Sequence, residues 1–303
     1  MQTVSVGRSG LVSSRLIYGC MRMLGDGTSD DVARGKAAVH AAFDAGYTHF
    51  DHADIYAGGG CEAAFGELLR ETPGLRDQIL ITTKCGIRFA GENGAPKRYD
   101  FSKQHIVNSV EGSLERLGIE QIDILLLHRP DYLMNPQEVA EAFAELRSAG
   151  KVANFGVSNF SPAEISLLQS VVDVPLIANQ VEINLHHIAP VEDGTLSYCM
   201  EHDIAAQAWS PLAGLVFPAW GNTFTEAQAE RLRVEAERQA AAYGVDVSLI
   251  ALAWVLRLPA RVAPIVGSTH PDRIRDATRA LDVPYSRSDW YRLLEARNGA
   301  EVP

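Results

Sequence analysis

Residues 102–128 read SKQHIVNSVEGSLERLGIEQIDILLLH, a helical pattern followed by a short apolar run. Ser102 is a suitable N-cap and Gly118 a suitable terminator, so we predict a helix over Ser102–Leu117. Ile122–Leu127 is apolar almost throughout, which is typical of a parallel strand buried on both faces. His128 follows at the carboxyl end of that strand. This unit of a helix and a buried strand recurs along the chain.

Eight runs of this kind are predicted strands: Leu16–Gly19, Thr48–Phe50, Ile79–Thr83, Ile122–Leu127, Asn154–Val157, Ile177–Gln180, Ala205–Ala208 and Val262–Val266. Helical patterns lie between and after them, at Asp31–Ala45, Ser102–Leu117, Pro136–Ala149, from Ser161-Pro162 onward, Glu226–Tyr243, Ser248–Arg257, Pro271–Arg279 and Ser286–Arg297. Eight strand–helix repeats in about 250 residues predict an α/β fold, a closed (β/α)₈ TIM barrel.

The two ends of the chain add to this barrel. Residues 4–12 predict an N-terminal β-hairpin that plugs the barrel bottom, and the last segments predict extra C-terminal helices. An open doubly wound sheet is the rival fold. Its G-x-G-x-x-G turn is absent, because the first strand leads into GCMRMLG at residues 19–25. No Pro-, Ser- or Gly-rich linker divides the chain, so one domain over residues 1–303 is predicted.

Composition excludes several classes of protein. The net charge of −11 argues against a nucleic-acid partner or a membrane surface, since both need a basic face. No long apolar run or basic leader is present, so a cytoplasmic location is expected. The four cysteines are far apart and show no metal-binding spacing. Adjacent His186 and His187 do not converge easily on one ion, and no metal site is predicted.

Ionisable residues stand where the predicted strands end. Asp51, Lys84 and His128 follow the second, third and fourth strands, and Tyr56 lies on the loop five residues after Asp51. Each has an ordinary explanation on its own, as a loop cap, a paired lysine, a core histidine and a packing aromatic. In a barrel, however, the carboxyl ends of all strands meet at one mouth, where the chemistry is found. Their joint placement therefore indicates an active site.

Later strands end in polar groups as well, and these would face the same mouth. They are Ser158, Asn159, Gln180, Glu182, Trp209, Ser210, Gly267 and Ser268. Several loop residues are candidates for lining a substrate pocket, with ordinary loop packing as the alternative for each: Met21, Met23, Phe89, Tyr132, Phe217 and Trp220. The run Gly58–Gly60 is interpreted as a flexible loop that shapes the mouth.

Six motifs or residues stand out along the chain: GYTHFDHADIY at 46–56, Lys84, LHRP at 127–130, GVSNF at 156–160, NQVE at 179–182 and WSPL at 209–212. In this order, along essentially the whole chain, they resemble the motifs of the aldo-keto reductase superfamily. The resemblance is nearest to a bacterial oxidoreductase branch of that superfamily. It implies a barrel that binds NADP in extended form across its mouth.

The resemblance also implies roles for single residues. Tyr56 would be the general acid, Lys84 and Asp51 its supporting ion pair, and His128 the group that orients the carbonyl of a small-molecule substrate. Ser158, Asn159 and Gln180 match positions that hold the nicotinamide carboxamide. Trp209 matches the aromatic residue on which the nicotinamide stacks, and Ser210 and Leu212 match the pyrophosphate loop.

The adenosine end of the cofactor site is implied at Gly267, Ser268 and Arg273. Two positions depart from the family pattern: Gly267 stands where a lysine is common and Ala277 where an asparagine is common. A guanidinium suits a phosphate, so Arg273 favours NADPH. Use of NAD is the alternative.

The chemistry can be argued from the residues as well. Adding hydride to a carbonyl builds negative charge on oxygen, which an aimed donor stabilises. A free phenol has a pKa of about 10, and a neighbouring ammonium lowers it. We therefore expect NADPH-dependent reduction of aldehydes and ketones. An NADP-binding sensor or regulatory subunit without turnover is the alternative, and a barrel lyase or isomerase that acts on phosphates is a third. The chain is expected to be a monomer or a small homo-oligomer.

Overall fold

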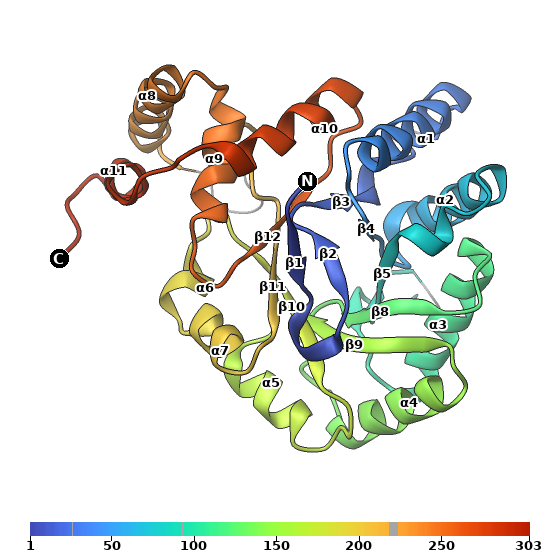
Figure 1. Ribbon diagram of the computed structural model, residues 1–303. Coiled ribbons are helices and arrows are strands. Elements are labelled where there is room, and N and C mark those ends of the chain that lie inside the picture. Colours follow the sequence, from blue (N-terminus) through green and yellow to red (C-terminus); the bar gives the residue numbers. More distant parts are fainter. Residues whose placement is uncertain (26, 92–93, 218–223) are drawn as a thin grey trace.

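Eight parallel strands form a closed barrel in the computed structural model, which describes residues 1–25, 27–91, 94–217 and 224–303 (Figure 1). The strands follow one another around the barrel in chain order: β3 (Ile17–Gly19), β4 (His49–Asp51), β5 (Leu80–Cys85), β8 (Ile122–Leu127), β9 (Val152–Ser158), β10 (Leu176–Glu182), β11 (Ala205–Trp209) and β12 (Ala263–Val266). The predicted (β/α)₈ barrel is therefore confirmed. All eight predicted strands are present, with ends that differ from the prediction by two residues at most.

The barrel is sealed between its first and last strands. β12 pairs with β3 in parallel, with Ile265 opposite Ile17 and Val266 opposite Tyr18. These partners lie 248 positions apart in the sequence. The sheet therefore has no free edge within the barrel.

Helices surround the barrel in the arrangement that strand–helix alternation predicts (Figure 1). They are α1 (Ser29–Asp44), α2 (Gly60–Glu71), α3 (Lys103–Leu117), α4 (Pro136–Ser148), α5 (Pro162–Gln169), α6 (Ala189–Glu192), α7 (Thr195–Glu201), α8 (Glu226–Tyr243), α9 (Val247–Leu256), α10 (Pro271–Ala277) and α11 (Arg287–Asn298). Several predicted caps are present: the Ser102 hydroxyl accepts a hydrogen bond from His105 N, and Ser161 with Glu164 forms a complete capping box.

Three helices were not predicted: α2, α6 and α7. The run Gly58–Gly60 was interpreted as a flexible loop, but Gly58 and Gly59 form a tight turn with φ of 62° and 91°, and Gly60 begins α2. Glycine tolerates positive φ, so the run reverses the chain direction directly into the helix. α6 and α7 are too short to show a helical period.

An antiparallel hairpin of β1 (Thr3–Ser5) and β2 (Val12–Ser14) lies across one end of the barrel, as predicted (Figure 1). The hairpin is held to the start of β4, because Ser14 N donates to Thr48 Oγ1 at 2.9 Å and Ser13 Oγ lies 3.0 Å from His49 Nδ1. The covered end is thus the one where the strands begin. A second small hairpin, β6 (Ile87–Arg88) with β7 (Arg98–Tyr99), was not predicted.

The main core lies between the strands and the helices. Phe143 of α4 stacks on Phe155 of β9 with ring centroids 4.1 Å apart, and Trp254 of α9 stacks on Trp290 of α11 at 4.9 Å. No single helix in the described part of the chain is long and apolar enough to span a membrane. α8 and α9 meet that test only as a pair bent by 91°, and α9 is largely buried in the core.

Candidate active site

A buried ion pair sits at the carboxyl ends of β4 and β5. Lys84 Nζ donates to Asp51 Oδ2 at 2.7 Å, and the two side chains are 0% and 4% exposed. The same ammonium donates to the carbonyl oxygen of His52 at 2.7 Å and to the hydroxyl of Tyr56 at 3.2 Å. Its three hydrogens thus have three oxygen partners. A buried lysine would be costly without such partners.

Tyr56 is held over this pair by the turn that follows β4. Tyr56 begins the 3₁₀ turn Tyr56–Gly59, in which Ala57 adopts a φ of 49°. Its ring meets the ring of His128 edge to face, with centroids 6.1 Å apart. His128 follows β8, and its backbone N donates to Cys85 O at 2.9 Å. The structure therefore brings the four predicted residues into one cluster, in which Lys84 contacts the phenol hydroxyl, Asp51 contacts Lys84, and the His128 ring packs against the Tyr56 ring.

Burial and charge set the protonation states of this cluster. Burial raises the pKa of Tyr56; the Lys84 ammonium opposes this shift and Asp51 adds to it. Burial alone lowers the pKa of Lys84, but Asp51 and Tyr56 outweigh it, so the net direction is upward. Burial, and then the charges of Lys84 and Arg129, hold the pKa of His128 well below its usual value. Near neutrality the cluster therefore holds a neutral phenol, an ammonium and a neutral imidazole.

The sequence argument considered only the ammonium beside the phenol, and so expected a lowered pKa for Tyr56. In the structure Lys84 does act in that direction, but burial of the phenol outweighs it. Removing a phenolate from water costs more free energy than one nearby charge returns. The net pKa shift is therefore upward.

One ring nitrogen of His128 is buried without a partner. Nδ1 forms no hydrogen bond with any group in the described part of the chain. A buried polar atom of this kind is unusual outside functional sites. The imidazole beside the Tyr56 ring therefore keeps a hydrogen-bonding capacity that the described part of the chain does not use.

The predicted residues of β9, β10 and β11 form a second connected group. Ser158 Oγ donates to Gln180 O at 2.7 Å, and Asn159 Nδ2 donates to His128 O at 3.2 Å. The indole nitrogen of Trp209 donates to Asn159 Oδ1 at 2.9 Å. Asn159 has a φ of 63°, so its side chain is held in place at the cost of backbone strain. A half-buried aromatic face and fixed amides thus lie beside the Tyr56 cluster.

Ser210 and Leu212 lie in the loop after β11. Ser210 has a φ of 50°, and its carbonyl accepts a hydrogen bond from Asn184 Nδ2 at 3.1 Å. Leu212 is half-buried against the core. Neither makes a hydrogen bond to the Tyr56 cluster, but both follow directly from the strand that carries Trp209.

The third predicted group lies beyond β12, next to β3. The Tyr18 hydroxyl donates to Ser268 O at 3.0 Å, and a Cβ built at Gly267 would come no closer than 3.7 Å to Gly19 O. Arg273 on α10 is exposed and has no ion pair or hydrogen bond within the described ranges. Its neighbours are paired, Arg275 with Asp272 at 3.0 Å and Arg279 with Asp276 at 2.6 Å. Of these arginines, Arg273 is the one free to bind an anion.

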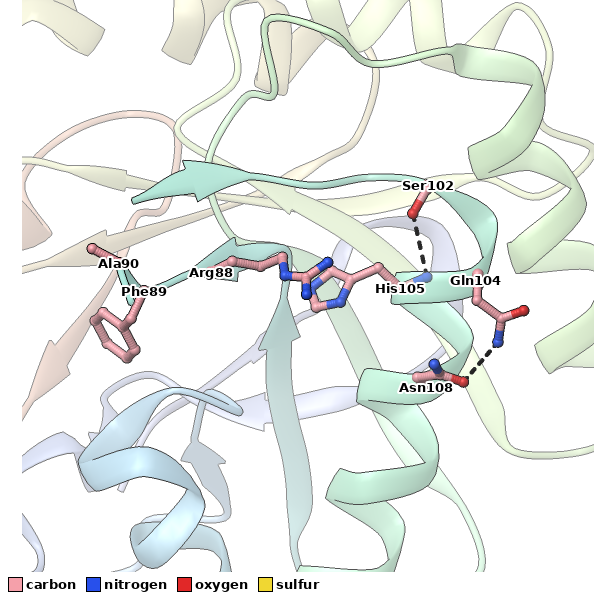
Figure 2. Close-up of a pocket in the computed structure, with 7 residues that line it drawn as sticks. All are labelled: Arg88, Phe89, Ala90, Ser102, Gln104, His105 and Asn108. Atoms are coloured by element: carbon pink, nitrogen blue, oxygen red, sulfur yellow. Dashed lines mark hydrogen bonds between the residues drawn. The ribbon is translucent and has the colours of Figure 1, made fainter. Parts of the chain in front are cut away.

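The residues predicted as candidates for lining a substrate pocket lie in different environments in the structure. Met23 is buried in the core, whereas Tyr132 is 94% exposed. Phe217 lies under the Arg22 guanidinium, 5.3 Å from ring centroid to Cζ. Trp220 lies outside the described residues. Phe89 lines a cavity of about 560 Å³, formed together with Arg88, Ala90, Ser102, Gln104, His105 and Asn108 (Figure 2). That cavity includes none of the four clustered residues.

Two features were not predicted from the sequence. The carbonyl of His52 completes the coordination of the Lys84 ammonium, and no sequence pattern marks a backbone oxygen. Gln207 on β11 lies fully buried behind Gln180; a glutamine within an apolar strand was the available signal. In the described ranges, no group of three His, Cys, Asp or Glu side chains is arranged to hold a metal ion.

The family model for the aldo/keto reductase family matches residues 15–298 of the chain. Among curated relatives, a protein named 6-dehydroglucose reductase from Agrobacterium fabrum (strain C58) is 40% identical over 294 residues, which cover 95% of this chain and 96% of the relative. A probable voltage-gated potassium channel subunit beta from Oryza sativa subsp. japonica is 31% identical over 307 residues, covering 93% and 92%.

A solved structure, that of the thermostable aldo-keto reductase Tm1743, superposes with a TM-score of 0.81. The match covers 98% of this chain and 100% of that one, at 24% identity. Identity at that level supports the fold alone.

Proposed function

Because this chain belongs to the aldo/keto reductase family of oxidoreductases, we propose that it reduces aldehyde and ketone carbonyls to alcohols with NADPH. The contact between Lys84 Nζ and the Tyr56 hydroxyl, 3.2 Å long, carries this proposal. It joins a proton donor to a buried cation that favours the charge left behind. Asp51 holds that cation in place at 2.7 Å.

Tyr56 is the general acid in this proposal. Its raised pKa keeps the phenol protonated near neutrality, so a proton is available as negative charge develops on the substrate oxygen. Lys84 stabilises the phenolate that forms. The neutral imidazole of His128 offers a hydrogen bond to the same oxygen and thereby orients the carbonyl.

The residues around this cluster suit a nicotinamide cofactor. The half-buried Trp209 ring is held beside Asn159 by its indole N–H, and the Arg129 guanidinium lies over the ring with Cζ 5.1 Å from its centroid. The nicotinamide would stack on this ring. Ser158, Asn159 and Gln180 would hold the carboxamide, and Ser210 and Leu212 the pyrophosphate. When bound, the reduced nicotinamide supplies the hydride.

NADPH is preferred in this proposal because Arg273 is unpaired and lies on the helix that follows Ser268. A free guanidinium binds a phosphate through two parallel hydrogen bonds. Gly267 contributes no side chain there, so NAD is the alternative cofactor. Titration with NADPH and with NADH, followed by intrinsic fluorescence, decides between the two.

The test is Tyr56→Phe, assayed against a panel of aldehydes and ketones. Positioned proton transfer is worth about 10² to 10⁴ in rate, so turnover should fall by that factor while NADPH affinity stays unchanged. Tyr291→Phe is the matched control, because Tyr291 is 38% exposed on α11. A Tyr56→Phe enzyme with near-normal turnover rules out the assigned role.

A regulatory subunit is the second candidate, and the similarity to a channel beta subunit favours it. It predicts tight NADPH binding, no turnover of any simple aldehyde, and a stable partner in pull-down. Turnover without any added nicotinamide would instead support a lyase or isomerase.

A further inference from the structure

A hydrogen-bonded pair of glutamines lies inside the barrel beneath the Asp51–Lys84 pair. Gln180 of β10 and Gln207 of β11 are direct register partners, and they are 2% and 1% exposed. Gln180 Nε2 donates to Asp51 Oδ1 at 2.8 Å and to Gln207 Oε1 at 3.0 Å. One amide nitrogen therefore bridges the two acceptors.

This bridging fixes which way the Gln180 amide faces. Asp51 Oδ1 and Gln207 Oε1 are both acceptors, so the amide must turn its NH₂ group, and not its oxygen, toward them. Both hydrogens of that NH₂ group are then used. The carbonyl oxygen of Gln180 is directed away from this pair of acceptors.

The consequence reaches Tyr56 through a continuous chain of contacts. Gln207 holds Gln180, which holds one oxygen of Asp51; the other oxygen of Asp51 holds Lys84, which donates to the Tyr56 hydroxyl. A hydrogen bond to a carboxylate stabilises its charged form and fixes its orientation. Gln207 itself touches none of the reacting groups.

We propose that Gln207 is a positioning residue, which orients the Gln180 amide and thereby holds Asp51 and Lys84 in register with the Tyr56 hydroxyl. This inference rests on the proposed function and extends it to the interior of the barrel. Burying a polar side chain in an apolar strand costs free energy unless it is hydrogen-bonded. Between Ala206 and Ala208 an apolar residue would serve packing equally well.

Gln207 lines a cavity of about 370 Å³ at the hairpin-covered end of the barrel, together with Ser13 and His49. An altered side chain there has space to adjust. Gln207→Leu is therefore expected to fold, and it removes the acceptor at nearly constant volume.

Gln207→Leu should lower kcat for aldehyde reduction about tenfold at saturating NADPH, the effect of about one hydrogen bond, and leave the KM for the aldehyde within about twofold. The charged and titratable groups that face Tyr56 are Lys84, Asp51, His128 and Cys20. The Lys84 ammonium lowers the pKa of Tyr56, so when Lys84 is held less firmly the high-pH limb of the kcat profile should shift to higher pH. Gln207→Glu places a buried carboxyl next to Asp51, which keeps the new group protonated. The protonated carboxyl still offers an oxygen acceptor, so this variant should restore much of the lost rate.

A double-mutant cycle separates positioning from a structural effect. In the Gln180→Leu background, Gln207→Leu should have no further effect beyond about twofold, because it acts through that amide. The control is Gln239→Leu in α8, which removes another fully buried glutamine that is bonded to Glu235. It should lower stability without changing kcat or the pH profile.

Two results would overturn the inference. One is a Gln207→Leu enzyme with wild-type kcat and pH profile; the other is a double variant whose loss of kcat equals the product of the losses in Gln180→Leu and Gln207→Leu. If the wild type turned over no carbonyl substrate, the proposed function would be wrong instead. In that case the NADPH affinities of the wild type, the two single variants and the double variant are measured by fluorescence. Gln207→Leu should weaken NADPH binding several-fold in the wild-type background, and should have no such effect in the Gln180→Leu background. Equal NADPH affinities of the wild type and Gln207→Leu would overturn the inference.

Discussion

Replacing His49 with glutamine should make the stability of the protein less sensitive to acid. His49 is fully buried in β4, with Nε2 2.7 Å from Thr82 Oγ1 and Nδ1 3.0 Å from Ser13 Oγ. Burial, and then the charge of Lys84, lower its pKa from 6.5 to about 3. The folded protein therefore keeps this ring neutral at a pH where the unfolded chain protonates it.

The sign and size of the effect follow from linkage. The folded pKa lies below the unfolded one, so stability from this ring is complete above about pH 6.5 and falls as the pH drops toward 3. One pKa unit corresponds to about 1.4 kcal/mol, and pH 5 lies about 1.5 units below the unfolded pKa. The free energy of unfolding should therefore fall by about 2 kcal/mol through His49 alone on going from neutral pH to about pH 5.

Urea unfolding of the wild type and His49→Gln at about pH 7.5 and about pH 5 measures this term. The variant should be less stable at neutral pH, because its packing differs, but its loss on acidification should be smaller by about 2 kcal/mol. His40→Gln is the control for replacing a histidine that is not buried, since His40 is exposed on α1. Parallel pH dependences of the wild type and His49→Gln would refute the reasoning.

Three further changes have outcomes that the structure sets. Lys84→Met should destabilise the fold by about 3–5 kcal/mol, because it leaves a buried carboxylate unpaired, and adding Asp51→Asn should recover part of that loss in urea unfolding. Burial, and then Glu62, raise the pKa of Asp54 to about 7, so its contribution to stability is lost as the pH rises from about 4 to 7. Asp54→Asn should remove that decline, so the variant should be about 3–4 kcal/mol more stable than the wild type near pH 8. Equal thermal midpoints of the two proteins at that pH would contradict this. Arg273→Ser should weaken NADPH binding about 10- to 100-fold and leave NADH binding unchanged in fluorescence titrations; equal losses for both would refute a phosphate-specific contact.

Much of the barrel could be predicted because its parallel strands are buried on both faces. Ile122–Leu127 is apolar at nearly every position and matched the observed strand in both bounds, whereas Leu176–Glu182 begins one residue before and ends two residues after the predicted Ile177–Gln180. The ends of strands depend on backbone pairing with neighbours, which side-chain polarity does not report. α2 was missed because it begins at Gly60, directly after Gly58 and Gly59, and contains Gly66, and glycine is unfavourable in helix interiors.

The site was predictable as a set of strand ends, but its geometry was not. Asp51, Lys84 and His128 converge because parallel strands end at one mouth. Tyr56 is the first residue of a turn with positive φ at Ala57, a conformation that alanine rarely adopts and that no sequence pattern signals. Gln207 was overlooked for a related reason: whether a residue of a buried strand points inward is settled by register, and its contact with Gln180 comes from the neighbouring strand.

The seam between β3 and β12 has a consequence for biosynthesis. Until Ala263–Val266 leaves the ribosome, a nascent chain that has reached β11 carries two unpaired strand edges, one on β3 and one on β11. Unpaired amides and carbonyls along such margins recruit other chains. C-terminal truncations before Ala263 should therefore accumulate as insoluble material, because a seven-stranded remnant has no partner with which to complete its ring.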